Sequence, residues 1–245
     1  MANDAQSPAD AVRVNDLHLR LTSAAGPVHV LRGIDLRVSV GETVSVIGPS
    51  GSGKTSLLLV IAGLERPTSG SIIAAGNEIT RLDEDALALF RRDNVGLVFQ
   101  DFHLVPTMTA IENVALPLEF TGHDDAFARA EAQLSTVGLA ARGGHYPAQL
   151  SGGEQQRVAM ARAFVTEPAI LLADEPTGNL DGETGRAVID VLFEMHARRN
   201  STLLLVTHEV SVADRCARQI HLVDGRIAND TRNAPASTAA PKAGP

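Results

Sequence analysis

The sequence predicts an α/β domain in which helices cover a parallel β-sheet, with an all-helical insertion near the middle of the chain. Short β-branched and aliphatic runs alternate with helical patterns and glycine-rich turns, which is typical of a parallel sheet. Between about residues 101 and 162 only the helical periodicity remains. The chain has 245 residues, of which 44% are hydrophobic and 20% charged, so it can bury a sizeable core.

Four apolar runs are expected to form strands, and helical segments follow three of them. These runs are Thr43–Ile47, Val95–Phe99, Ala169–Ala173 and Thr202–Val206. Within the insertion, helices are expected over Ala110–Phe120, over Asp125–Val137 and again after Ser151. Residues 1–10 and the Pro/Ala-rich residues 229–245 are expected to be disordered, which leaves a domain over residues 11–228.

Composition also limits the partners and the location of the chain. The longest apolar stretch, Leu57 to Ala62, is far shorter than the ~20 residues that cross a bilayer, and the first ten residues lack the apolar core of a secretory signal. We therefore expect a cytoplasmic chain without a membrane span. The net charge of -8 disfavours binding to nucleic acid or anionic lipid. Cys216, the only cysteine, cannot form an internal disulfide and is expected to be a small buried hydrophobe.

A phosphate-binding loop is predicted directly after the first of these runs. The pattern GxxxxGK followed by Ser or Thr is matched by Gly48, Pro49, Ser50, Gly51, Ser52, Gly53, Lys54 and Thr55. Glycines let backbone N–H groups turn towards phosphate oxygens, and the helix that follows adds a positive dipole end. Lys54 supplies a point charge, and the Thr55 hydroxyl can ligate Mg²⁺. The alternative is a glycine-rich structural turn.

Asp174 and Glu175 provide the acidic element that a phosphate loop needs to hold a metal. They come at the end of an apolar run, and a carboxylate at the carboxyl end of a buried parallel strand faces the crevice where α/β proteins bind ligands. Asp174 suits a Mg²⁺ role, and Glu175 is placed to accept a proton from an attacking water or to orient it. An acidic pair in a surface turn is the alternative.

A second glycine-rich helix start, LSGGEQQR, covers residues 150–157. By itself it could hold an anion or be an ordinary helix cap. Lying between the phosphate loop and the ADEP of residues 173–176, it resembles the signature sequence of ABC ATPases, and the GNLD of residues 178–181 resembles their D-loop. The resemblance covers about residues 11–227, and the motifs follow the family's order.

The resemblance implies a P-loop NTPase (RecA-like) core with an antiparallel β subdomain and an all-helical insertion. It also implies a Mg²⁺-dependent ATPase whose cofactors are ATP and Mg²⁺, with the loop from Gly48 to Thr55 and the adjoining Ser56 binding the nucleotide. Gln100 matches the family's Q-loop glutamine, which would join Thr55 and Asp174 at the metal. His208 matches the switch histidine that contacts the γ-phosphate, so that Glu175, His208 and Gln100 form the expected catalytic set.

The resemblance further implies a homodimer with two shared sites. In similar proteins the signature of one subunit closes over the phosphate loop of the other, and here those signature residues are Ser151, Gly152, Gly153 and Glu154. Asp181 belongs to the D-loop at the same contact. One copy of each motif per chain would complete two equivalent sites.

The sequence around the motifs resembles the subgroup of lipoprotein-release, macrolide-export and cell-division ATPases. The resemblance is strongest to an export-type branch paired with a large permease. This implies a subunit held at the inner face of the cell membrane by a separate integral membrane permease. A regulatory ATPase of cell-envelope or cell-division control is the alternative. An ABC protein acting on DNA or ribosomes is disfavoured, because coiled-coil insertions, a second cassette and a basic arm are missing from the sequence. The substrate is recognised by the partner in such systems.

Two further expectations follow from the resemblance. The segment after Gln100, with Phe102, Leu104, Val105 and Pro106, should dock on the membrane partner, unless it simply packs the insertion. Many relatives stack the adenine on an aromatic residue ahead of the phosphate loop, but the first phenylalanine here is Phe90 and the only tyrosine is Tyr146. Leu21 takes the stacking position, with Val28 or His29 beside it, so we expect the base to be held with little selectivity.

Overall fold

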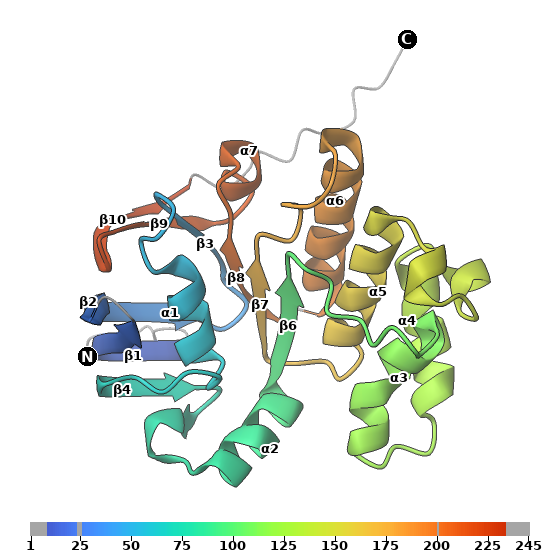
Figure 1. The fold of residues 1–245 in the computed structure, drawn as a ribbon, viewed down its shortest axis with the longest axis horizontal. Coiled ribbons are helices and arrows are strands. Elements are labelled where there is room, and N and C mark those ends of the chain that lie inside the picture. Colours follow the sequence, from blue (N-terminus) through green and yellow to red (C-terminus); the bar gives the residue numbers. More distant parts are fainter. Residues whose placement is uncertain (1–8, 24–25, 200, 234–245) are drawn as a thin grey trace, which may run out of the picture.

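The computed structural model describes residues 9–23, 26–199 and 201–233, which form two sheets and the helices around them (Figure 1). The first sheet has the order β2-β1-β4-β5 and the second the order β10-β9-β3-β8-β7-β6. The strands are β1 (Asp10–Ser23), β2 (Gly26–Ser39), β3 (Thr43–Ile47), β4 (Ser69–Ala74), β5 (Asn77–Glu78), β6 (Val95–Phe99), β7 (Ile170–Asp174), β8 (Thr202–Val206), β9 (Arg218–Val223) and β10 (Arg226–Arg232). The helices are α1 (Lys54–Ile61), α2 (Glu84–Asn94), α3 (Ala110–Phe120), α4 (Ala126–Thr136), α5 (Gly152–Phe164), α6 (Gly182–Arg199) and α7 (Val210–Ala213).

The second sheet is the predicted parallel sheet. Strands β9, β3, β8, β7 and β6 run parallel, and β10 adds an antiparallel edge. The first sheet is antiparallel throughout, as the resemblance implied. Three of the four predicted strands have the predicted bounds, and the fourth, expected over Ala169–Ala173, lies one residue later as β7.

Helices and the antiparallel sheet cover both faces of the parallel sheet, because its central strands are apolar on both sides. In β7, Ile170 and Leu172 belong to one apolar cluster, whereas Leu171 and Ala173 belong to the other. Residues alternate in the same way along β8. Successive side chains of a strand point to opposite faces, so a continuous apolar run predicts a strand that is buried twice.

Helix α1 lies between the two sheets (Figure 1). Four of its five apolar residues, Leu57, Leu58, Val60 and Ile61, are buried and join one cluster with strands of both sheets, whereas Leu59 is partly exposed. A helix with so wide an apolar surface needs a position that buries most of it. The helix start that follows the phosphate loop is thereby fixed relative to both sheets.

The insertion contains the three helices that the sequence predicted, α3, α4 and α5. Its apolar residues do not form a core of their own. They share one cluster with α6 and with the face of the sheet that carries Leu171 and Leu203. The insertion is therefore packed directly on the parallel sheet.

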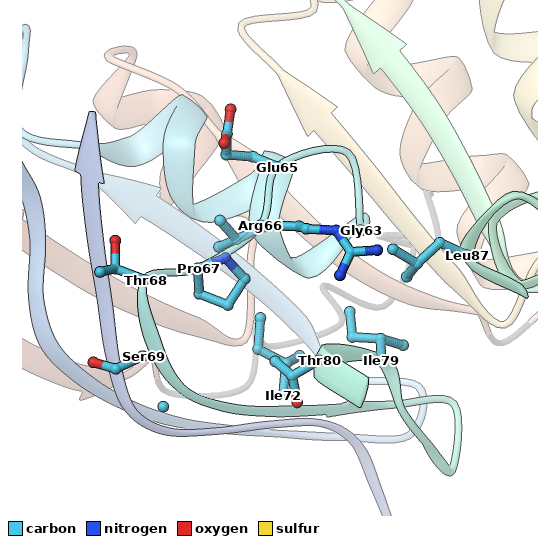
Figure 2. Close-up of a pocket in the computed structure, with 12 residues that line it drawn as sticks. Gly63, Glu65, Arg66, Pro67, Thr68, Ser69, Ile72, Ile79, Thr80 and Leu87 are labelled. Carbon is cyan, nitrogen blue, oxygen red and sulfur yellow. The ribbon is translucent and has the colours of Figure 1, made fainter. Parts of the chain in front are cut away.

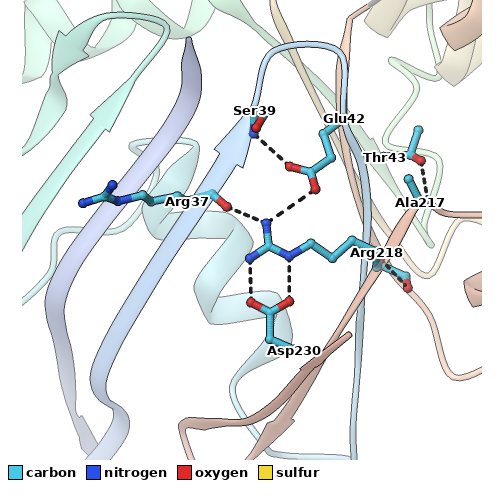
Figure 3. A network of polar contacts seen from close by, with 8 residues as sticks. Arg37, Ser39, Glu42, Thr43, Ala217, Arg218 and Asp230 are labelled. Carbon is cyan, nitrogen blue, oxygen red and sulfur yellow. Dashed lines mark hydrogen bonds and ion pairs between the residues drawn. The ribbon is translucent and has the colours of Figure 1, made fainter. Parts of the chain in front are cut away.

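The expected start of the disordered tail at residue 229 is wrong, since β10 continues to Arg232. The reason is a polar network around Arg218, which is 12% exposed (Figure 3). Its Nε and Nη2 donate to the two carboxylate oxygens of Asp230 at 2.6 and 2.5 Å. Its Nη1 donates to the backbone oxygen of Arg37 at 2.7 Å and lies 3.5 Å from Glu42. One guanidinium therefore joins the end of the parallel sheet to β2. The domain also begins one residue early, at Asp10, and residues 1–8 and 234–245 lie outside the described residues.

Cys216 is buried, and desolvation raises the pKa of its thiol to about 12, as expected for a small core residue. Across the described residues, helices that combine the length and the apolar character of a membrane span are absent.

Candidate nucleotide site

A cavity of about 390 Å³ opens at the carboxyl ends of β3, β6, β7 and β8. Each of these strands is followed by a segment that contributes to the wall. The lining residues are Val30, Ser50, Gly51, Gly53, Lys54, Thr55, Ser56, Gln100, Glu175, Gly178, Val206 and His208. The structure thus brings together most of the residues that the sequence assigned to phosphate, metal and water.

The phosphate loop connects β3 to α1 in a conformation that only glycine permits at two points. Gly48 has φ 148°, and a Cβ there would collide with the carbonyl oxygen of Leu222. Gly53 is the N-cap of α1 with φ 101°, and no side chain caps the helix. The first N–H groups of α1 are therefore left for another acceptor, and a phosphate anion suits them.

Lys54 is buried, and its Nζ donates to the backbone oxygens of Gly48 and Pro49, both at 2.9 Å. These bonds bend the loop around the ammonium group. Gly48 and Pro49 thus shape the loop and do not line the cavity. Ser52 is also outside the lining; its backbone oxygen accepts from Gly225 at 3.1 Å.

Asp174 ends β7 and is largely withdrawn from water. Burial raises the pKa of its carboxyl, while a hydrogen bond from Thr55 and the charge of Lys54 act in the opposite direction. Its Oδ1 is buried without a hydrogen-bond partner among the described residues. An orphaned buried carboxylate oxygen beside a threonine hydroxyl fits a Mg²⁺ site, because Mg²⁺ prefers oxygen ligands.

Glu175, the next residue, is held in a strained conformation with φ 47°. Its N–H donates to the backbone oxygen of Val206 at 3.0 Å, which ties the end of β7 to β8. Its Oε2 lies 2.7 Å from Nδ1 of His208, whose side chain is 68% exposed. The two expected catalytic side chains are therefore in contact across the cavity mouth.

Gln100 follows β6 and lies against the D-loop. Its Nε2 donates to Oδ1 of Asn179 at 2.9 Å, and Nδ2 of Asn179 donates back to the Gln100 backbone oxygen at 3.2 Å. Asp181 of the same loop caps α6, since its Oδ1 accepts from the N–H groups of Glu183 and Thr184. Sequence reasoning assigned no role to Asn179, whose partner is 79 positions away.

The signature residues do not line the cavity of their own chain. Ser151 and Glu154 form a capping box at the start of α5, with Glu154 Oε2 accepting from the Ser151 N–H at 2.8 Å. Hydrogen bonds from the Ser151 backbone hold the pKa of Glu154 below its usual range. Gly152 and Gly153 form the first turn and pack beside Leu180 and Thr184. Within one chain, this motif is a helix cap.

The expected docking segment is half-buried. The Arg162 guanidinium donates to the backbone oxygens of Phe102 and His103 at 3.1 and 2.7 Å. Leu104 packs against the cluster of the insertion, and the Asn113 amide bonds both polar backbone groups of Val105. The alternative reading, packing of the insertion, thus holds for part of this segment.

The β1–β2 hairpin borders the phosphate loop through Val30 and carries Leu21 and Val28, which face each other in register. These two side chains are 39% and 48% exposed. His29 is engaged with His18, ring to ring, with Nδ1 of His18 3.2 Å from Nε2 of His29. The surface that the hairpin offers to a base is therefore aliphatic.

A second hollow, of about 240 Å³, lies between the end of α1, β4 and α2 (Figure 2). Arg66 points across it and donates to Glu84 and to the backbone oxygen of Leu82. Its other walls combine apolar side chains, including Ile72, Ile79 and Leu87, with polar ones such as Glu65 and Thr80. None of the predicted site residues lines it, so we assign the nucleotide to the cavity at the strand ends.

A glycine-rich loop between a parallel strand and a helix, with a lysine inside it and a carboxylate at the end of a neighbouring strand, defines a P-loop nucleotide hydrolase. The model of the family described as ABC transporter matches residues 31–178, and the chain belongs to this family.

Relatives and solved structures agree with this placement. The lipoprotein-releasing system ATP-binding protein LolD of Geobacter metallireducens is 48% identical over 89% of this chain and 98% of that protein. The uncharacterized ABC transporter ATP-binding protein YbbA of Escherichia coli K12 is 45% identical over 88% and 96%. The macrolide export ATP-binding/permease protein MacB 1 of Aeromonas hydrophila is 46% identical over 85% of this chain but only 32% of that protein.

The ATP-binding cassette MJ0796, solved as a dimer in a post-hydrolysis state bound to ADP and Pi, matches with a TM-score of 0.84 and 37% identity. The match covers 91% of this chain and 99% of that one. These findings confirm the predicted fold, the family and the subgroup. The chain is an ATP-binding subunit of the type that LolD and MacB represent.

Replacing Asp174 by Asn should raise the melting temperature of the nucleotide-free protein by about 2 °C and abolish ATP hydrolysis. Burial raises the pKa of Asp174, so the ionised side chain opposes folding at pH 7 and the amide removes this cost. The difference between variant and wild type should shrink as the pH falls towards about 4, where the unfolded carboxyl also binds a proton. Asp190→Asn, at an exposed partner of Arg215, is the matched control and should bring no gain. A variant less stable than wild type at pH 7 would contradict this account.

Replacing Leu21 by Tyr should tighten ATP binding several-fold without altering turnover at saturation, because stacking contributes ~1 to 3 kcal/mol per base. Wild type should bind GTP nearly as well as ATP. Competition with a fluorescent nucleotide measures both, and Leu64→Tyr, at an exposed leucine away from the hairpin, is the control. A wild-type preference for ATP of about a hundredfold, or roughly 2.7 kcal/mol, would reveal a base-specific contact and refute this account.

Proposed function

We propose that the chain hydrolyses Mg²⁺-ATP as a homodimer with shared sites and drives a separate integral membrane permease. The observation that carries this proposal is the cavity in which Lys54, Thr55, Gln100, Glu175 and His208 meet. In it, the phosphate loop and Lys54 bind the phosphates. Thr55, Asp174 and Gln100 would hold Mg²⁺, which would neutralise charge at the phosphates when bound.

Glu175 is the group that orients the attacking water and accepts its proton. Its Oε2 contacts Nδ1 of His208, and we assign the imidazole to the γ-phosphate by similarity to the family. The two residues follow the adjacent strands β7 and β8. Chemistry then depends on the closure of the site around the nucleotide.

The signature supports a shared site. Ser151 and the first turn of α5 are outside the cavity of their own chain, although this helix start has N–H groups that suit a phosphate. A second copy can bring its signature over the phosphate loop, as the dimeric state of MJ0796 suggests by similarity. We therefore propose that Ser151, Gly152, Gly153 and Glu154 act on the partner's nucleotide, with Asp181 at the same contact.

The permease is proposed from the family and the relatives. LolD is named as the ATP-binding protein of a releasing system and MacB as an ATP-binding/permease protein, and the match here covers only 32% of MacB. Export or transmembrane force transmission through a partner fits this division, and it would hold the subunit at the cytoplasmic face of the membrane. Control of the cell envelope or of division is the second candidate, and the identity of the membrane partner separates the two.

Glu175→Gln should still bind ATP but stall hydrolysis, and so accumulate as a closed dimer, whereas Lys54→Ala should lose turnover by weakening phosphate binding. Gel filtration in saturating Mg²⁺-ATP measures the dimer, and phosphate release measures turnover. Glu194→Gln, at an exposed glutamate paired with Arg198, should behave as wild type. A Glu175→Gln protein that stays monomeric, under conditions where wild type hydrolyses ATP, would count against the shared site.

Phe102→Asp should release the membrane partner while leaving basal ATP hydrolysis intact. Pull-down of the tagged chain from its native membranes identifies the partner, and the variant should lose it because a carboxylate replaces an apolar contact. Val40→Asp, at an exposed valine outside the insertion, should retain it. A fall in melting temperature with loss of basal hydrolysis would show instead that Phe102 only packs the insertion.

A further inference from the structure

The carboxamide of Gln100 is oriented by a hydrogen bond in which its nitrogen is the donor. Its Nε2 donates to Oδ1 of Asn179 at 2.9 Å. The Nδ2 of Asn179 in turn donates to the carboxylate of Asp101 at 2.8 Å and to the Gln100 backbone oxygen at 3.2 Å. Within the described residues, no protein group donates to Oε1 of Gln100. The three side chains therefore form a short chain of bonds that ends at this oxygen.

The direction of this chain is set by its far end. The two ends of a carboxamide are alike in shape, so hydrogen-bond partners decide its orientation. Both partners of the Asn179 Nδ2, a carboxylate and a backbone carbonyl, can only accept. Turning the Asn179 amide over would place its oxygen against two oxygens. Its Oδ1 must therefore face Gln100, and only Nε2 of Gln100 can donate to it.

The surroundings of Gly178 independently support this position of the Gln100 carboxamide. A Cβ at Gly178 would lie 2.8 Å from both Cδ and Nε2 of Gln100, which is closer than side chains approach one another. The carboxamide in this position thus lies where a side chain at residue 178 would displace it. Gln100 and Gly178 both line the cavity that contains Thr55. The exposed carboxamide therefore lies between the D-loop and the proposed metal site, where its hydrogen bonds orient it.

We infer that Asp101 and Asn179 are positioning residues that orient the Gln100 carboxamide, with Nε2 turned to the D-loop and Oε1 left for Mg²⁺. The inference rests on the proposed function, because it takes Gln100 as a metal ligand. Of the two ends of the carboxamide, only the oxygen suits Mg²⁺, which prefers hard oxygen donors. Outer partners that orient a ligand matter for the affinity of a metal site. Since residues 178–181 also form the D-loop, the proposed dimer contact and the metal ligand share one hydrogen-bond chain.

The test measures metal binding in the full-length Glu175→Gln protein with saturating ATP. Mn²⁺ is the probe, and its dissociation constant is read by electron paramagnetic resonance. Adding Asn179→Leu should weaken Mn²⁺ binding about tenfold, while the affinity for ATP in excess EDTA and the melting temperature stay unchanged. Asn77→Leu is the matched control, because Asn77 is an exposed asparagine whose Nδ2 also donates to a backbone oxygen, at 2.9 Å, and it should leave Mn²⁺ binding unchanged.

Exchanging the carboxylate and the amide between positions 101 and 179 tests the direction of the hydrogen bonds. Asn179→Asp places a second carboxylate against Asp101 and should also weaken Mn²⁺ binding. Adding Asp101→Asn restores a donor opposite residue 179, which still accepts from Gln100, so the double variant should regain part of the Mn²⁺ affinity. Recovery should be incomplete, because the new carboxylate still faces the Gln100 backbone oxygen that Asn179 contacts in wild type. Rescue would not be expected if the asparagine only filled space.

Three results would overturn the inference. Asn179→Leu or Gln100→Ala could bind Mn²⁺ as tightly as the Glu175→Gln parent. Mn²⁺ affinity and metal-free ATP affinity could fall by the same factor in Asn179→Leu, which would point to a general disturbance of the loop. The double variant could bind Mn²⁺ no better than Asn179→Asp. If the parent bound ATP neither with nor without metal, the proposed function itself would fail, and that outcome is separate from the others.

Discussion

Because β3, β8, β7 and β6 run parallel in adjacent register, their carboxyl ends meet at one edge of the sheet, and the whole nucleotide site depends on this alignment. Val46 is level with Val206, Val206 with Asp174, and Asp174 with Phe99. The phosphate loop, His208, Glu175 and Gln100 each follow one of these strands. Four segments that are far apart in the chain therefore emerge at the same height around one cavity.

Several locally unfavourable features lie at the same edge of the sheet. A helix start without a cap, a buried carboxylate oxygen without a partner and a glutamate with positive φ all lie there. Each would be unfavourable by itself, and each becomes useful when phosphate, metal and water are present. The packing around α1 and the two apolar clusters offsets these costs, and the Arg218 network closes the far edge of the sheet.

Groups that are contiguous in sequence were predictable. Short local patterns predict the phosphate loop, the pair Asp174 and Glu175, and the central strands. Each is encoded within a few residues, so the sequence indicates both its position and its chemical character. The Gln100–Asn179 contact was not predictable, because it joins loops 79 positions apart through two neutral amides that any surface could carry. The extent of β10 was missed for a similar reason: Asp230 reads as part of a polar tail until Arg218 is seen to bind it.

The two apolar clusters meet at the parallel sheet, whose central strands contribute to both. Opening either cluster alone would still leave β7 and β8 covered on the other face. The backbone amides of these strands should therefore be the slowest in the protein to exchange with deuterium, and they should do so only through global unfolding. Amides of the insertion can exchange through a smaller opening, because the apolar cluster of the insertion can open while the cluster around α1 stays packed on the opposite face of the sheet. Local opening on one side of the sheet thus leaves the strand ends of the nucleotide site in register.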